Sequence, residues 1–329
     1  MKGNMSTMSR AIASGTLFLL TAVVQAQPVP PSAFPSKPVR IIVPYSGGSS
    51  DVTARILAPK LQEVFRQPVI VENKPGANAV IGTDYVAKAP ADGHTLLAVI
   101  TTHVISPSLI TTPYDPLRDF AAVTTFSAAE LGFAIYPGVP ANNLQELIAL
   151  GKAKPGELNY ATTQIGGNQH LAGELFAILT GAKFTAVPFK GGGEALGAVL
   201  GGHAQMYFGS LTSLIPPMKN GKLRAMAVSG DKRTPALPDV PTFTQAGVPN
   251  FDVRLWYGLL APAATPKDVV ERVNSVIANI INTPELKEAL AKQGMDPLLM
   301  SPAQFGALMR TDFDRYAKII KTANIKVDN

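Results

Sequence analysis

The sequence of 329 residues is 46% hydrophobic and 16% charged, a composition typical of a chain that folds around buried cores. It contains no cysteine, which excludes disulfides, thiolate metal sites, a cysteine nucleophile and a lipoprotein anchor. The formal net charge is +6, but the Lys and Arg residues are scattered without a basic run. The composition therefore favours a two-domain globular protein with no nucleic-acid partner.

The N-terminus has the three-part layout of a secretory signal peptide. Lys2 and Arg10 precede an uncharged apolar stretch at residues 11–24, and Val24 to Ala26 places small residues where a signal peptidase cleaves. The apolar stretch is shorter than the roughly 20 residues that a membrane-spanning helix needs. We therefore predict a signal peptide over residues 1–26, cleavage near Ala26 and export to the periplasm.

The first half of the mature chain alternates between apolar strands and amphipathic helices. A helix is predicted to start at Asp51 as its N-cap, and it contains Pro59, which should kink it or cost stability. A second helix is predicted at residues 79–88. The buried strands that alternate with these helices are predicted at residues 39–45, 68–72 and 95–101. This alternation favours parallel sheets with helices on both faces.

The second half repeats the alternation and ends in helices. Residues 231–249 are rich in Pro and Thr and are predicted to form a loop, followed by an extended stretch at 251–261. Thr265 before Pro266 predicts a helix with Thr265 as its N-cap. The other expected elements are strands at 156–161, 184–189, 206–208 and 223–228, and helices at 168–179, 194–200, 284–293 and 302–323.

Four glycine-rich turns connect a predicted strand to a predicted helix. They lie at residues 46–51, 75–78, 165–168 and 190–193. Glycine allows close approach of the backbone to a ligand, and the helix that follows offers unpaired N–H groups and the positive end of its dipole. Any one turn is equally typical of a tight connection without a ligand. Four turns, two in each half of the chain, favour two rims around one anion-binding cleft.

The usual signatures of a cofactor or a catalytic centre do not occur in the sequence. The glycines at 191–197 and 76–82 do not fit the dinucleotide fingerprint, and there is no phosphate-binding loop and no G-x-S-x-G elbow. None of the histidines has metal-ligand spacing. His94 and His203 are interpreted as structural, whereas His103 and His170 are compatible with either packing or ligand contact. We therefore predict no cofactor, no metal and no catalytic residue.

Several sequence stretches together resemble the Bug receptors, the substrate-binding proteins of the tripartite tricarboxylate transporter type. The resemblance covers the chain from about Phe34 to the end. The stretches that carry it are PSKPVRIIVPY at 35–45, GGSSDVTAR at 47–55, VENKPGA at 71–77, ADGHTLL at 91–97, QHLAGELF at 169–176, PFKGGG at 188–193, DVPT at 239–242 and WYGL at 256–259.

The resemblance implies a type II periplasmic binding-protein fold, with two α/β domains joined by two crossing strands around a cleft. The first domain would comprise residues 34–128 and 252–329, and the second residues 129–251. The implied protein is a monomeric solute receptor and not an enzyme. Its ligand would be a small carboxylic acid, an amino acid or a nicotinate-like acid, delivered to membrane subunits of a tripartite transporter.

The resemblance also implies candidate ligand-binding residues. They form two groups, one in each domain, on opposite sides of the cleft. Those of the first domain are Tyr45, Gly48, Ser49, Ala77, Asn78 and Ala79, and those of the second are Thr163, Asn168, His170, Gly191 and Gly192. The sequence departs from the family pattern at Ser46, Asn78 and Glu194. The family pattern at the second turn is Gly-Ala-x-Gly, whereas Asn78-Ala79 carries no glycine, although asparagine tolerates a positive φ.

Two other functions remain as alternatives at this point. A sensory protein would bind the same ligand and present it to a signalling partner. An exported hydrolase would use Asp51 together with His103 or His170.

Overall fold

The computed structural model describes residues 34–45, 49–163, 165–189, 191–293 and 295–327. The predicted signal peptide, Ser46 and the candidate residue Gly48 lie outside the described residues. Within the described ranges, no helix is long and apolar enough to cross a membrane. The same ranges hold no cluster of three or more His, Asp or Glu side chains arranged to bind a metal.

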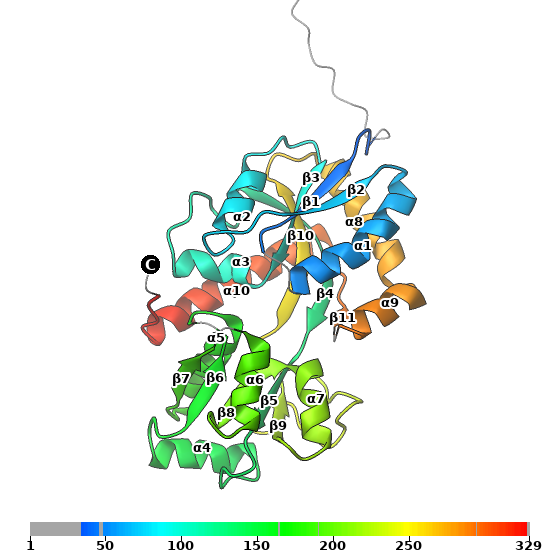
Figure 1. The fold of residues 1–329 in the computed structure, drawn as a ribbon. Coiled ribbons are helices and arrows are strands. Elements are labelled where there is room, and N and C mark those ends of the chain that lie inside the picture. Colours follow the sequence, from blue (N-terminus) through cyan, green and yellow to red (C-terminus); the bar gives the residue numbers. More distant parts are fainter. Residues whose placement is uncertain (1–33, 46–48, 164, 190, 294, 328–329) are drawn as a thin grey trace, which may run out of the picture.

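The strands form two separate sheets, and each sheet with its helices forms one lobe (Figure 1). The sheet of the first lobe has the strand order β11-β4-β10-β3-β1-β2. Its strands are β1 (Val39–Val43), β2 (Val69–Asn73), β3 (Thr95–Ile100), β4 (Phe120–Ala129), β10 (Leu255–Pro262) and β11 (Asp296–Pro297). Its helices are α1 (Ser49–Phe65), α2 (Val80–Ala87), α3 (Thr102–Ile105), η2 (Ser106–Ser108), α8 (Lys267–Ile281), α9 (Pro284–Ala291) and α10 (Pro302–Thr322).

The second lobe is built from the middle of the chain. Its sheet has the strand order β7-β6-β8-β5-β9. The strands are β5 (Leu131–Ile135), β6 (Asn159–Thr162), β7 (Thr185–Pro188), β8 (Met206–Ser210) and β9 (Arg224–Val228). The helices are α4 (Leu144–Ala153), α5 (Asn168–Thr180), α6 (Gly192–Leu200) and α7 (Leu211–Lys219).

The expectation of parallel sheets holds only in part, because both sheets are mixed. Strand β1 is parallel to β2 and β3, but β10 is antiparallel to both of its neighbours, β3 and β4. In the second lobe β5 is antiparallel to β8 and β9. Two of the strands that break the parallel pattern, β5 and β10, are those by which the chain enters a sheet from the other lobe, and the short β11 is antiparallel to β4 as well.

The chain crosses between the lobes twice. Glu130 alone separates β4 of the first sheet from β5 of the second, and the return runs from the end of β9 at Val228 to the start of β10 at Leu255. The crossings are tied together, because Ser229 N–H donates to Leu131 O at 2.9 Å and Leu131 N–H donates to Ser229 Oγ at 2.9 Å. The domain limits at 128/129 and 251/252 stay a prediction.

Two expected helix caps are wrong. Helix α1 begins at Ser49, so Asp51 lies in its first turn, where its carboxylate accepts a hydrogen bond from Arg55 at 2.9 Å. Helix α8 begins at Lys267 with Pro266 as its N-cap, and the Thr265 hydroxyl makes no hydrogen bond. A proline at the cap position replaces the side-chain acceptor that the sequence pattern suggested.

Apolar clusters lie on both faces of the first sheet. One face packs against α1, α8 and α9, and the other packs against α10 through Trp256, Phe305 and Tyr316. This second cluster continues into the second lobe, where it includes Phe133 and Phe176. Helix α10 contacts α5 directly, and the hydrophobic core is therefore continuous from one lobe to the other.

Candidate functional site

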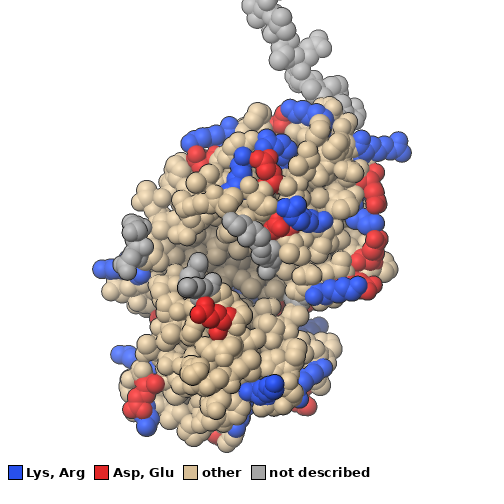
Figure 2. Space-filling view, in the orientation of Figure 1, with Lys and Arg blue, Asp and Glu red and all other residues tan. Residues whose placement is uncertain are grey.

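The four glycine-rich turns are paired by the topology of the two sheets. Strands β1 and β2 are parallel neighbours, and so are β6 and β7. Because each of these strands runs directly into one of the turns, the carboxyl ends place two turns side by side on each lobe. Figure 2 shows a hollow between the two lobes. Leu109 of the first lobe contacts the second, since a Cβ added to Gly166 would lie 2.4 Å from its Cδ1.

The turn after β2 has an unusual backbone. Gly76, Ala77, Asn78 and Ala79 all have positive φ, at 129°, 46°, 53° and 75°. For an alanine the left-handed conformation costs about 1 kcal/mol or more, so this turn is held in place against local preference. Strain of this kind concentrates at ligand-binding turns. Ala79 is also the N-cap of α2, and the turn therefore leads into the amide-rich start of that helix.

The described residues on either side of the turn after β1, Tyr45 and Asp51, are held by side chains from elsewhere in the lobe. The Tyr45 hydroxyl lies 2.7 Å from Thr102 Oγ1, and burial raises the pKa of Tyr45 to about 12, so it remains a neutral hydrogen-bonding group. Asn73 joins the two first-lobe turns: its amide donates to Tyr45 O at 2.9 Å and to Asp51 Oδ1 at 2.8 Å. Arg55 lowers the pKa of Asp51 by hydrogen bonding and charge.

The turn after β6 places a buried polar group at a helix start. Gly166 has a φ of 78°, and α5 begins two residues later at Asn168. Asn168 is only 7% exposed, and its Oδ1 has no hydrogen-bond partner in the described part of the chain. Thr163 donates to Gln169 Oε1 at 2.8 Å, which ties the end of β6 to the first turn of α5. An unsatisfied buried acceptor is costly without a ligand.

The turn after β7 leaves open space beside its glycines. A Cβ added to Gly191 would meet no atom within 4 Å, whereas one on Gly192 would lie 3.2 Å from the Tyr207 hydroxyl. That hydroxyl donates to Gly192 O at 3.5 Å, a long hydrogen bond. Glu194 is exposed in the first turn of α6.

The two histidines that sequence reasoning left open are both buried and engaged. The His103 ring lies 3.0 Å from Pro116 O through Nε2, and burial lowers its pKa to about 4. His170 accepts from Gly166 N–H through Nδ1 at 3.0 Å, and burial lowers its pKa to about 4 as well. Asp51 is paired with Arg55 and Asn73. The hydrolase arrangement of Asp51 with either histidine therefore has no support in these contacts.

Sequence reasoning missed four residues that hold the predicted site. They act through hydrogen bonds to its turns and are Asn73, Thr102, Gln169 and Tyr207. Asn73 and Gln169 were within the family-like stretches, so their polar side chains next to the turns were a usable signal. Thr102 is the first residue of α3 and Tyr207 lies in β8, and no local pattern indicates their contacts. Of Ser49, the structure describes only its position as the first residue of α1.

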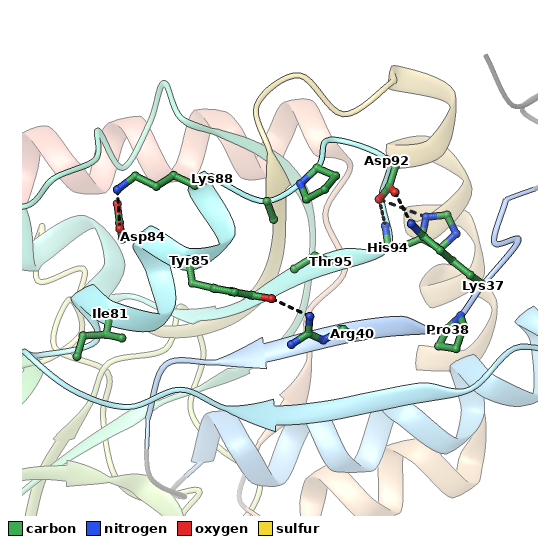
Figure 3. Close-up of a pocket in the computed structure, with 12 residues that line it drawn as sticks. Lys37, Pro38, Arg40, Ile81, Asp84, Tyr85, Lys88, Asp92, His94 and Thr95 are labelled. Carbon is green, nitrogen blue, oxygen red and sulfur yellow. Dashed lines mark hydrogen bonds and ion pairs between the residues drawn. The ribbon is translucent and has the colours of Figure 1, made fainter. Parts of the chain in front are cut away.

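A further groove of about 710 Å³ lies on the first lobe between α2 and strands β1 and β3 (Figure 3). Its charged side chains are paired with one another. Arg40 donates to the Tyr85 hydroxyl at 2.7 Å and also pairs with Glu72. Lys88 pairs with Asp84 at 2.7 Å, and Lys37 pairs with Asp92 at 2.9 Å. Because these cations are already neutralised, we assign no acid ligand to this groove.

Comparisons with known proteins agree with this arrangement. The chain is 34% identical to Protein BugT of Bordetella pertussis over 97% of this chain and 99% of that protein. Among solved structures, an R. palustris protein with adipate matches with 30% identity, 89% and 99% coverage and a TM-score of 0.75. MatC from Rhodopseudomonas palustris with bound malate matches with 28% identity, 87% and 100% coverage and a TM-score of 0.71.

The family assignment rests on most of the chain. The model described as "Tripartite tricarboxylate transporter family receptor" matches residues 53–325, which include three of the four turns and both crossings between lobes. The resemblance to the Bug receptors is confirmed, and so is the periplasmic binding-protein fold. The chain belongs to the tripartite tricarboxylate transporter receptor family.

Proposed function

We propose that this protein is an extracytoplasmic solute receptor that binds a small carboxylate between its lobes and performs no chemistry on it. The observation that carries the proposal is the pairing of turns at neighbouring strand ends, two on each lobe, around one hollow. The candidate residues are neutral, and backbone amides at helix starts are suited to hold an anion. Relatives described with adipate and with malate support a carboxylate ligand.

The same proposal includes the setting in which the receptor works. After removal of residues 1–26, the mature chain acts as a monomer in the periplasm and delivers its ligand to membrane subunits of a tripartite transporter. The lobes, taken as residues 34–128 with 252–329 and residues 129–251, close around the ligand by a hinge motion at the two crossings. Family membership supports the transporter as the partner.

A panel of acids tests the ligand class. We expect malate, adipate, aspartate or nicotinate at 100 times its dissociation constant to add about 2.7 kcal/mol to the free energy of unfolding. The measurement is the melting temperature of the mature protein with each acid, with glucose and Mg²⁺ as controls. Recovery of the acid unaltered after incubation excludes turnover. A shift with glucose or Mg²⁺ and with no acid would contradict the carboxylate proposal.

A charge placed at the second-lobe turn is expected to repel the ligand. Asn168→Asp adds a carboxylate at the start of α5, where the helix dipole favours it, so the fold should persist. At a separation of about 8 Å and an effective dielectric constant of about 20, repulsion of about 2 kcal/mol weakens binding about 30-fold. Isothermal titration with the acid selected by the panel measures this loss.

The matched control for this change is Asn143→Asp at the start of α4. Asn143 is exposed, caps its helix by accepting from Glu146 N–H at 2.9 Å and belongs to the same lobe. We expect unchanged affinity in this variant. Equal affinities of Asn168→Asp and the unmodified protein would remove Asn168 from the site.

A further inference from the structure

The second-lobe turn at Gly166 and Asn168 is held by a side chain from the first turn of helix α5. The His170 side chain is only 7% exposed, and its Nδ1 accepts the Gly166 N–H at 3.0 Å. An accepting Nδ1 carries no proton, so the neutral ring has its proton on Nε2. The turn that leads into Asn168 is therefore fixed by one defined tautomer of one buried ring.

Glu174 lies one helical turn further along α5, on the same face as His170. Its Oε1 is 3.7 Å from His170 Nε2, longer than a hydrogen bond but near enough for the carboxylate to favour a proton on that nitrogen. The Tyr160 hydroxyl from β6 donates to the same oxygen at 2.8 Å and lies 3.3 Å from His170 O. Tyr160 also limits the space around α5, since a Cβ on Gly173 would lie 2.5 Å from its ring.

These contacts form a chain of interactions that ends at the ligand-binding turn. It runs from Tyr160 through Glu174 and His170 to Gly166. The Nδ1 nitrogen of His170 is occupied by the Gly166 N–H, and its Nε2 lies beside the Glu174 carboxylate inside the lobe. Side chains of this kind lock the groups that contact the ligand into one geometry.

We propose that His170 is a positioning residue, which fixes the Gly166–Asn168 turn for ligand binding while Glu174 selects the ring tautomer. This deepens the proposed function and rests on it for the ligand. In this proposal His170 acts by positioning the turn, and not by contacting the ligand directly as the sequence suggested. Glutamine can supply an acceptor oxygen for the Gly166 N–H, and leucine cannot, so these two substitutions separate acceptor chemistry from side-chain volume.

Binding of malate, or of adipate where malate does not bind, provides the first test. We expect His170→Leu to weaken binding about tenfold, the loss of one buried hydrogen bond, and His170→Gln to retain affinity within about threefold. Glu174→Leu removes the carboxylate that favours the Nε2–H tautomer and is expected to weaken binding in the same direction. Unchanged affinity in His170→Leu overturns the proposal. Equal loss in the Gln and Leu variants assigns the ring itself to ligand contact and also overturns it.

His94→Leu is the matched control. His94 is also buried and accepts a backbone N–H, that of Ser36 at 3.2 Å, but it lies in the first lobe beside the groove of Figure 3. We expect this variant to lose stability and to keep its affinity. A loss of affinity equal to that of His170→Leu would show that general destabilisation explains the result, and the positioning role would fail.

Hydrogen exchange of the Gly166 amide separates this inference from the proposed function. In the ligand-free protein, we expect faster exchange at Gly166 in His170→Leu than in His170→Gln or His94→Leu. If neither acid binds the unmodified protein, the carboxylate proposal fails, while the exchange rates still decide whether His170 holds the turn. Equal exchange rates in all variants overturn the positioning role.

Discussion

Asp312→Ala is expected to lower the free energy of unfolding by about 3–4 kcal/mol. The Asp312 side chain in α10 is 2% exposed. It accepts from Trp256 Nε1 at 2.7 Å and pairs with Arg315. Burial nevertheless raises the pKa of Asp312, because desolvation outweighs the attraction of Arg315. Alanine would leave the buried indole N–H without its acceptor and would leave Arg315 with Asp252, at 2.6 Å, as its remaining carboxylate partner.

Urea unfolding followed by tryptophan fluorescence measures this effect at the site itself, because Trp256 is the only tryptophan. Asp314→Ala is the matched control: Asp314 lies on the same helix and is exposed, so its loss should change stability by less than about 0.5 kcal/mol. Asp312→Asn keeps an acceptor for the indole N–H, so its free energy of unfolding should lie between those of Asp312→Ala and Asp314→Ala. If Asp312→Ala and Asp314→Ala unfold at the same urea concentration, the Trp256 contact contributes little.

Acidification from pH 7 to pH 5 is expected to destabilise the protein through His103 and His170. Burial lowers the pKa of each to about 4, whereas the unfolded histidine has a pKa of about 6.5. Between about pH 6.5 and pH 4, the two histidines are therefore protonated in the unfolded state and neutral in the folded state. Each histidine contributes stability that is fully present above pH 6.5 and is lost as the pH falls toward 4, about 2 kcal/mol by pH 5.

Variants isolate this effect from other titrating groups. His103→Gln and His170→Gln should each remove about half of the histidine contribution to the fall, measured by urea unfolding at pH 7 and pH 5. Burial raises the pKa of Glu174, which acts in the opposite direction, so the comparison between variants and unmodified protein is decisive. His203→Gln, at an exposed position after α6, is the control. A fall of the same size in all four proteins would contradict the assignment.

Local sequence patterns predicted most of the elements around the site. Strand β3 and helix α5 were expected within one residue of their observed limits, because an apolar run and a 3.6-residue period are local properties. Helix α7 was missed because Pro216 and Pro217 lie inside it. Helix α4 was also missed, although Asn143 and Glu146 have the spacing of a helix start. The antiparallel direction of β10 depends on the second lobe and has no local signal.

The turns of the site could be predicted from the sequence, but the side-chain contacts that hold these turns could not. Glycine followed by the start of a helix indicates a turn, as at Gly166 and Asn168. The contacts that hold the turns join distant positions, such as Tyr45 with Thr102, and they appear only after the sheets are assembled. One support was accessible in principle: His170 and Glu174 are four residues apart, a spacing that brings side chains together on one helix face.

The unequal crossings between the lobes have a mechanical consequence. We expect Glu130 to act as the pivot of the proposed closure, because a one-residue connection spans at most about 3.6 Å and leaves almost no room for sliding. The return through residues 229–254 is long and could by itself allow larger displacements. Near Glu130, however, the two hydrogen bonds between Leu131 and Ser229 clasp the two crossings together. We therefore expect the proposed closure to turn about this clasp, with the packing of α10 on α5 as the second contact between the lobes that has to adjust.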